Sequence, residues 1–133
     1  MIIPKKSLGQ NFLVDTDVIN RIIKIVEIGN KNILEVGPGT GNLTEAILNQ
    51  NPKKLIVIEK DNKLSELLKM KYESKIEIIN KDILDVDENS LDKEKLIVFG
   101  NLPYNISTEI LCKWILNIKT KFWFDYLILM FQK

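Results

Sequence analysis

The chain has 133 residues, of which 45% are hydrophobic, enough for one domain with a single core. Its 19 Lys and Arg residues nearly balance 18 Asp and Glu residues, so the net charge of +1 does not mark a nucleic-acid binder and confines any RNA contact to local patches. One cysteine, Cys112, and no histidine exclude an intramolecular disulfide and a Cys/His zinc site, and no apolar run reaches the length of a membrane span. We therefore expect metal-free chemistry in a soluble cytoplasmic protein.

The first predicted element is an amphipathic helix. Asp15 is placed to cap it, and Gly29 is placed to end it. The apolar residues that recur at helical spacing are Val18, Ile19, Ile22, Ile23 and Val26. The elements expected after it are a strand at 32–36, a glycine turn at 37–41, a helix from Leu43 to Leu48, a strand at 55–58, a helix at 62–72 with Leu64, Leu67 and Leu68 inward, strands at 76–79 and 96–99, a helix at 107–116 and a strand at 126–131.

Short apolar strands alternate with helices along the chain. This pattern is typical of an α/β fold with a doubly wound, mostly parallel sheet and right-handed crossovers. Ligands of such folds bind at the carboxyl ends of the strands, near the switch point. The residues that follow each strand are therefore the candidates for chemistry.

The first such segment is the glycine turn, with Gly37, Gly39 and Gly41 at alternate positions. Glycines remove Cβ atoms where a turn passes close to a ligand, and the following helix begins with unpaired N–H groups. The spacing differs from the dinucleotide fingerprint G-x-G-x-x-G, which weakens the case for a bound pyrophosphate. An ordinary strand-to-helix turn would explain one glycine but explains three in five residues poorly.

Two acidic residues follow the next strands. Glu59 ends the second strand, where a carboxylate can accept hydrogen bonds from both hydroxyls of an adenosine ribose. Asp82 follows the third strand and is placed to accept a hydrogen bond from an adenine amino group. Each also has an ordinary interpretation, Glu59 as a solvated acid beside Lys60 and Asp82 as a turn or cap residue.

Asn101-Leu102-Pro103-Tyr104 directly follows the predicted fourth strand and carries the most specific chemistry. The exocyclic amine of a purine is a poor nucleophile because its lone pair is delocalised into the ring. The Asn101 side-chain oxygen and the Leu102 carbonyl could bind its two hydrogens and aim the lone pair at a methyl donor. Pro103 supplies no N–H, and Tyr104 could stack on a flipped base. The alternative is a simple turn with the tyrosine packed inward.

In this order, the features resemble the ribosomal RNA adenine dimethyltransferase family, whose bacterial small-subunit members are the KsgA-type enzymes. The matching segments are 6–13, 35–44, 57–61, 80–84 and 101–107, and the resemblance covers essentially the whole chain. It implies a Rossmann-like class I methyltransferase that uses S-adenosyl-L-methionine to dimethylate adenine N6 of small-subunit ribosomal RNA in a pre-30S particle.

The resemblance also implies a role for each matching position. The implied cofactor-binding residues are Gln10, Asn11, Leu13, Gly37, Gly39, Glu59, Lys60, Asp82, Ile83 and Asn101. The implied catalytic residues are Asn101, Leu102, Pro103 and Tyr104, with Tyr104 against the target adenine. No metal is implied.

Family members are longer, continuing into further strands and a helical domain that helps to grip RNA. We therefore expect residues 1–133 to form an incomplete catalytic domain whose fifth strand, 126–131, exposes an apolar edge. The expected consequences are aggregation or dependence on a partner, with little or no activity on RNA, whereas a full-length protein is expected to be a monomer.

Three other functions stay open. An Erm-type enzyme would methylate large-subunit RNA, although Gly9 and Leu102 favour the small-subunit group. A non-catalytic RNA-binding or assembly protein could retain the pocket, and a nicotinamide dehydrogenase shares the fold class but not the glycine spacing. The basic and aromatic segment 117–125 could contact RNA or pack its aromatic residues in the core.

Overall fold

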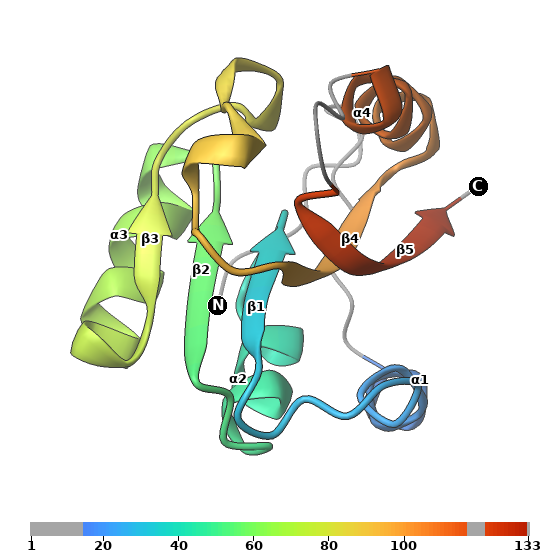
Figure 1. Cartoon of the computed structure of the whole chain (residues 1–133). Helices are drawn as coiled ribbons and strands as arrows, with labels where there is room; N and C mark the ends of the chain where they lie inside the picture. The colour runs from blue at the N-terminus through green and yellow to red at the C-terminus, as the bar shows by residue number, and fades with distance from the viewer. Residues whose placement is uncertain (1–14, 117–121, 133) are drawn as a thin grey trace.

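The computed structural model describes residues 15–116 and 122–132, and this part of the chain forms one parallel sheet with helices (Figure 1). The strands are β1 (Asn32–Val36), β2 (Lys54–Ile58), β3 (Glu77–Ile79), β4 (Leu96–Pro103) and β5 (Phe124–Gln132). Their order is β3-β2-β1-β4-β5, so the chain winds outward from β1 on one side and then on the other. This is the predicted doubly wound sheet, with its switch point between β1 and β4.

Helices follow most of the strands. The α-helices are α1 (Thr16–Ile22), α2 (Asn42–Leu48), α3 (Asn62–Tyr72) and α4 (Tyr104–Leu116). Among the described residues, short 3₁₀ turns are found at η2 (Glu73–Lys75), η3 (Ile83–Asp85) and η4 (Glu88–Ser90). Asp15 caps α1 as predicted, and Asp61 caps α3 in the same way, because each carboxylate accepts two main-chain N–H groups of the first turn.

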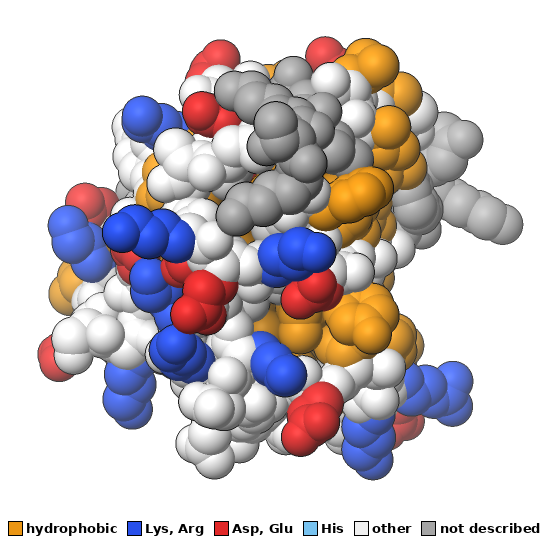
Figure 2. Space-filling model, in the orientation of Figure 1, with side chains coloured by type: hydrophobic (Ala, Val, Ile, Leu, Met, Phe, Trp, Pro, Cys, Tyr) orange, Lys and Arg blue, Asp and Glu red, His pale blue; other side chains and the backbone are white. Residues whose placement is uncertain are grey.

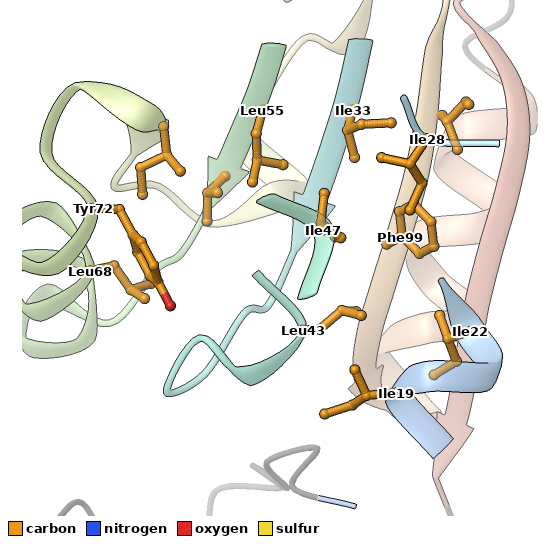
Figure 3. Packing of buried hydrophobic residues seen from close by; sticks show 13 residues of the cluster. Ile19, Ile22, Ile28, Ile33, Leu43, Ile47, Leu55, Leu68, Tyr72 and Phe99 are labelled. Atoms are coloured by element: carbon orange, nitrogen blue, oxygen red, sulfur yellow. The ribbon is translucent and has the colours of Figure 1, made fainter. Parts of the chain in front are cut away.

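Two apolar layers cover the two faces of the sheet. Successive strand residues such as Ile33 and Leu34 point to opposite faces, and both are fully buried. On one face α1, α2 and α3 pack against the strands, with Leu43, Ile47 and Leu68 between them (Figure 3). On the other face α4 packs with the segment that follows β3. The arrangement is a helix–sheet–helix sandwich whose central strands, β1, β2 and most of β4, are buried on both sides.

The first helix is shorter than predicted. It ends at Ile22 rather than near Gly29, and tighter bonds between residues three apart follow it, such as Ile25 N–H to the Ile22 carbonyl at 3.1 Å. β-Branched residues crowd this stretch, and they are weak helix formers. Ile19 and Ile22 are buried as expected, but Val18 is 38% exposed.

The fourth and fifth strands are longer than predicted. Strand β4 continues through Pro103 because β5 pairs with it along its whole length, up to Pro103 opposite Gln132. The segment Asn101–Pro103 is therefore the end of a strand rather than a loop after it, and α4 begins at Tyr104 instead of Ser107. The apolar pattern missed this extension because Asn and Pro are uncommon in strands.

Side chains of different kinds gather on different parts of the surface. In Figure 2 hydrophobic side chains gather toward β4, β5 and α4, whereas Lys, Asp and Glu are mixed over the α3 and β3 side. Leu67 of α3, predicted to face inward, is 47% exposed. Among the described residues, no helix has the length and apolar character needed to cross a membrane.

Candidate functional site

Three of the predicted site residues, Gly37, Glu59 and Asn101, lie in one row along the carboxyl edge of the sheet. Val36 of β1 is in register with Ile58 of β2 and Gly100 of β4, and Ile58 is in register with Ile79 of β3. One residue further along each strand, the chain therefore brings four residues side by side. This carboxyl-edge row consists of Asn101, Gly37, Glu59 and Asn80.

Main-chain and side-chain hydrogen bonds fix the row. Gly37 N–H donates to the Ile58 carbonyl at 3.1 Å, and Glu59 N–H donates to the Ile79 carbonyl at 3.0 Å. The Asn80 side-chain amide donates to the Glu59 carbonyl at 2.9 Å. The pairing of the sheet thus continues one step beyond the strands and holds the row in a defined geometry.

The glycine turn lies close against the end of β4. A Cβ on Gly37 would lie 2.8 Å from Leu102 Cδ2 and 3.0 Å from the Asn101 carbonyl oxygen, and the φ of Gly37 is +71°. Gly39 and Gly41 also have positive φ, at 60° and 92°. The backbone conformation therefore favours glycine at all three positions. At Gly37 the close approach of β4 also leaves no room for a side chain.

Glu59 is a buried carboxylate, 6% exposed, and not the solvated acid of the ordinary interpretation. Its Oε2 accepts the Asp61 N–H at 2.9 Å. Burial raises the pKa of Glu59, while hydrogen bonds from the main chain of Asp61 and Gly39 oppose that rise. The carboxylate is thus held at the glycine turn, where it can accept hydroxyl hydrogens. Neighbouring Lys60 is exposed.

Asp82 acts as a cap, as its ordinary interpretation predicted. Its Oδ1 accepts the Leu84 N–H at 3.0 Å at the start of η3. A carboxylate has two oxygens and several lone pairs, so this bond does not exhaust its capacity to accept. Asp82 is half-buried, and Ile83, the next residue, is buried at 5% exposure. The cap fixes where the carboxylate lies relative to the row.

The Leu102 carbonyl has a partner that the sequence did not reveal. The hydroxyl of Ser107, which is 2% exposed, donates to this carbonyl at 3.1 Å across the first turn of α4. A carbonyl oxygen has two lone pairs, so it can accept a second hydrogen bond. Ser107 lies inside the matched segment 101–107 but received no role, because a serine within a helix is usually a neutral choice.

Glu35 is a second residue without a predicted role. It lies in β1 with 1% exposure, and the Thr44 hydroxyl of α2 donates to its Oε1 at 2.5 Å. Burial raises the pKa of Glu35 to about 7, the Thr44 bond opposes the rise, and the charge of Glu59 adds to it. The sequence signal that could have pointed to Glu35 is a charged residue within an otherwise apolar strand.

Several predicted positions are placed only in part or not at all. Gln10, Asn11 and Leu13 lie outside the described residues, so their predicted cofactor contacts stay predictions. Pro103 ends β4 and Tyr104 begins α4. In the segment 117–125, Trp123 is a core residue, since it is 7% exposed and packs edge-on against Trp114 at a ring-centroid distance of 5.5 Å. Phe122 is 52% exposed.

The carboxyl-edge row is distinct from a hollow at the opposite edge of the sheet. That hollow has a volume of about 550 Å³ and lies where β2 begins, near Lys54, Glu45 and Tyr72. None of the predicted site residues that the structure describes lines it. Among the described residues, no three Asp, Glu or Cys side chains are grouped so that they could hold a metal ion. The row, with its glycine turn and buried carboxylate, is therefore the candidate site.

Comparisons with protein families and curated proteins agree with one another. The family model described as ribosomal RNA adenine dimethylase matches residues 3–133. The ribosomal RNA small subunit methyltransferase A of Pelagibacter ubique is 63% identical over 129 residues, which are 97% of this chain and 49% of that protein. The protein of the same name from Wolbachia pipientis subsp. Culex pipiens is 46% identical, over 98% of this chain and 50% of its own length. The chain therefore spans about half the length of these curated relatives.

Two solved structures share the fold. A dimethyladenosine transferase from Plasmodium falciparum superposes with a TM-score of 0.76 and 29% identity, covering 92% of this chain and 44% of that one. The 23S rRNA methyltransferase ErmE superposes with a TM-score of 0.67 and 32% identity, covering 80% of this chain and 43% of that one. The sheet described above is thus a Rossmann-like methyltransferase sheet.

Proposed function

The chain belongs to the ribosomal RNA adenine dimethylase family, and on that premise we propose that it is the S-adenosyl-L-methionine-binding part of an enzyme that dimethylates adenine N6 in small-subunit ribosomal RNA. The observation that carries the proposal is the contact between the glycine turn and the end of β4, which puts Asn101 and Leu102 beside Gly37. The partner in this proposal is ribosomal RNA within a pre-30S particle in the cytoplasm. Neither a metal nor a membrane takes part.

The carboxyl-edge row fits a nucleoside cofactor. The cofactor would lie over the glycine turn, where a Cβ on Gly37 would meet Leu102 and Asn101. The Glu59 carboxylate would accept the ribose hydroxyls, and Asp82 would accept the adenine amino group, with main-chain contacts from Ile83 and Gly39. Gln10, Asn11, Leu13 and Lys60 would complete the site. When bound, S-adenosyl-L-methionine supplies an electrophilic methyl group on a positively charged sulfur.

The residues at the end of β4 orient the nucleophile. The side-chain oxygen of Asn101 and the carbonyl of Leu102 would each accept one hydrogen of the target amine, which turns its lone pair toward the methyl donor. Ser107 already holds the Leu102 carbonyl with a hydrogen bond of 3.1 Å, so this acceptor is oriented before the base arrives. Catalysis is then chiefly positioning, and one amine proton passes to water as the new bond forms.

Pro103 and Tyr104 would hold the target base. Proline fixes its own φ and offers no competing N–H next to the Leu102 carbonyl. Tyr104 is the residue that we propose for stacking on the flipped adenine, as aromatic side chains do in single-stranded RNA recognition. In the second methyl transfer the monomethylated amine keeps one hydrogen, so one of the two acceptors would orient it.

Substitution of Asn101 tests this function. Methyl transfer from labelled S-adenosyl-L-methionine to small-subunit RNA is measured with this chain, alone and joined to the carboxyl-terminal half of the Pelagibacter ubique relative. Asn101→Ala should lower transfer by roughly 100-fold or more, the usual size of a lost positioning contact, while S-adenosylhomocysteine binding stays measurable. Asn49→Ala, an exposed residue after α2, is the control. Transfer by Asn101→Ala at the unsubstituted rate would contradict the proposal.

The same preparations separate the alternatives. An Erm-type function, favoured by the likeness to ErmE, predicts transfer to 23S rather than small-subunit RNA. A non-catalytic assembly protein predicts RNA binding without transfer to either RNA. A dehydrogenase predicts that NAD and not S-adenosylhomocysteine raises the melting temperature, since only a ligand of the folded state stabilises it.

A further inference from the structure

Lys113 of α4 makes three hydrogen bonds to the segment after β3. Its Nζ donates to the Ile83 carbonyl at 2.7 Å, the Val86 carbonyl at 2.6 Å and Glu88 Oε2 at 2.8 Å. An ammonium group has three hydrogens, so this geometry provides one acceptor for each. The Lys113 side chain is 18% exposed and that of Glu88 is 1% exposed. Such burial is rare for lysine and glutamate unless they are paired.

Glu88 is tied to α4 a second time. Its Oε2 also accepts the Nε1 hydrogen of Trp114 at 2.9 Å, and Trp114 is fully buried. Lys113, Glu88 and Trp114 together form what we call the Lys113 clamp. It joins the helix that begins at Tyr104 to the segment that begins at Asp82, which are separate parts of the candidate site.

The clamp reaches Asp82 through a single peptide group. Lys113 holds the carbonyl oxygen of the Ile83–Leu84 peptide, and the N–H of the same peptide donates to Asp82 Oδ1 at 3.0 Å. The two ends of one rigid, planar unit are thus fixed by opposite charges. A cation on the carbonyl also polarises the peptide and strengthens its N–H as a donor. These two hydrogen bonds therefore link the Lys113 ammonium to the Asp82 carboxylate through one peptide group.

We propose that Lys113 is a positioning residue that sets the selectivity of the site for adenine over other purines by fixing the Asp82 carboxylate. The inference rests on the proposed function, in which Asp82 accepts a hydrogen from the adenine amino group. Hypoxanthine carries a carbonyl oxygen at that place, which a well-positioned carboxylate repels. If the peptide loses its cation, the carboxylate can turn aside and discrimination weakens.

The test is the ratio of two dissociation constants, for S-inosylhomocysteine and for S-adenosylhomocysteine, measured by calorimetry on this chain. Lys113→Met should lower that ratio roughly tenfold, the size expected when a charge-assisted hydrogen bond is lost. Lys113→Arg, which keeps a cation with several donors, should restore most of it. A role in stability alone would change the melting temperature and leave the ratio as it was.

Three further variants serve as controls. Lys113→Met leaves the Glu88 carboxylate buried without its cation, which destabilises the fold, so the pair Glu88→Gln with Lys113→Met is measured as well. Glu88→Gln alone preserves both bonds from Lys113 to the carbonyls and should keep the ratio. Lys69→Met, at an exposed position of α3, is the control for loss of a lysine.

The outcomes separate the two proposals. An unchanged ratio in folded Lys113→Met or in the double variant would overturn the role of Lys113 while cofactor binding stands. An equal fall in Glu88→Gln would assign the effect to a general loosening and would also overturn it. Failure of the unsubstituted chain to bind S-adenosylhomocysteine would instead contradict the proposed function itself.

Discussion

At the scale of single residues, Glu35 is a buried carboxyl group whose pKa is raised. It is 1% exposed in the centre of the sheet, and its Oε1 accepts a hydrogen bond from the Thr44 hydroxyl. Because burial disfavours the charged form, the pKa of Glu35 is about 7 in the folded chain against 4.5 for a solvated glutamate. The folded state therefore holds a proton that the unfolded chain releases in this range.

This difference predicts how stability depends on pH. The contribution of Glu35 is fully present below about pH 4.5 and is lost as the pH rises to about 7, because there the folded state must give up its proton or keep it at a growing cost. The total change is at most about 3 kcal/mol. The pKa of Glu59 is also raised by burial, so its contribution has the same sign. The free energy of unfolding should fall across this window.

Glu35→Gln removes the titrating group and keeps an oxygen for the Thr44 hydroxyl. Urea unfolding at pH 5 and pH 8 should show a smaller loss of stability for Glu35→Gln than for the unsubstituted chain, and higher stability for the variant at pH 8. Glu66→Gln, at an exposed position of α3, is the control and should keep the original difference. An equal loss in Glu35→Gln would mean that another group causes the pH dependence.

At the scale of elements, buried strands and the glycine turn could be predicted well. Strand β1 and helix α3 begin and end where the apolar pattern placed them, because both have clear periodicity and polar flanks. The end of β4 could not be predicted, since Asn101 and Pro103 are paired with a strand that comes later in the chain. The residue at which α1 ends could not be predicted either, because it depends on tertiary packing and not only on the local sequence.

For the candidate site, the order of motifs was predictable but the support around them was not. Gly37, Glu59 and Asn101 are neighbours in the carboxyl-edge row, as expected from residues that follow adjacent strands. The Ser107 hydroxyl and the Lys113 ammonium act on main-chain carbonyls, and a sequence gives no information about which carbonyl a side chain will reach. Lys113 within the apolar stretch of α4 was the only available hint.

The glycine turn yields a prediction at this scale. Gly37→Ala places a methyl group 2.8 Å from Leu102 Cδ2 and 3.0 Å from the Asn101 carbonyl, at a φ of +71°. The positive φ alone costs about 1–2 kcal/mol, and the end of β4 must also shift. Because that shift displaces the groups proposed to contact the cofactor, we expect S-adenosylhomocysteine affinity to fall more than about tenfold, a loss of about 1.4 kcal/mol of binding free energy. Calorimetric titration measures it.

Gly29→Ala is the matched control for this substitution. Gly29 lies outside the positive-φ region, and a Cβ built on it would meet the Gln50 carbonyl oxygen at an ordinary contact distance of 3.4 Å. The control should bind with unchanged affinity. If Gly37→Ala also bound S-adenosylhomocysteine with unchanged affinity, the close approach of the glycine turn to β4 would not matter for binding. The proposed position of the cofactor over this turn would then be wrong.

At the scale of the whole molecule, charge and apolar surface are distributed unequally. The net charge is +1, so any long-range attraction to RNA is weak, and the RNA recognition that we propose must come from local contacts. The apolar surface gathers toward β4, β5 and α4 (Figure 2), where the exposed residues include Tyr126, Phe122 and Leu116. Among the described residues, β5 is the last strand of the sheet on that side. The sheet edge and the apolar surface therefore coincide.

This coincidence predicts self-association of the isolated chain, because an uncovered apolar edge strand is a template for pairing with another chain. Sedimentation velocity should show larger species as the concentration rises through the micromolar range. Tyr126 is 57% exposed on β5, and Tyr126→Lys should shift the chain toward monomer, since a charge on an edge strand opposes pairing. Met70→Lys adds the same charge at a residue of α3 that is 74% exposed and should leave association unchanged. A monomer at every concentration would show instead that the edge of β5 is protected, and the expected dependence on a partner would then have no structural basis.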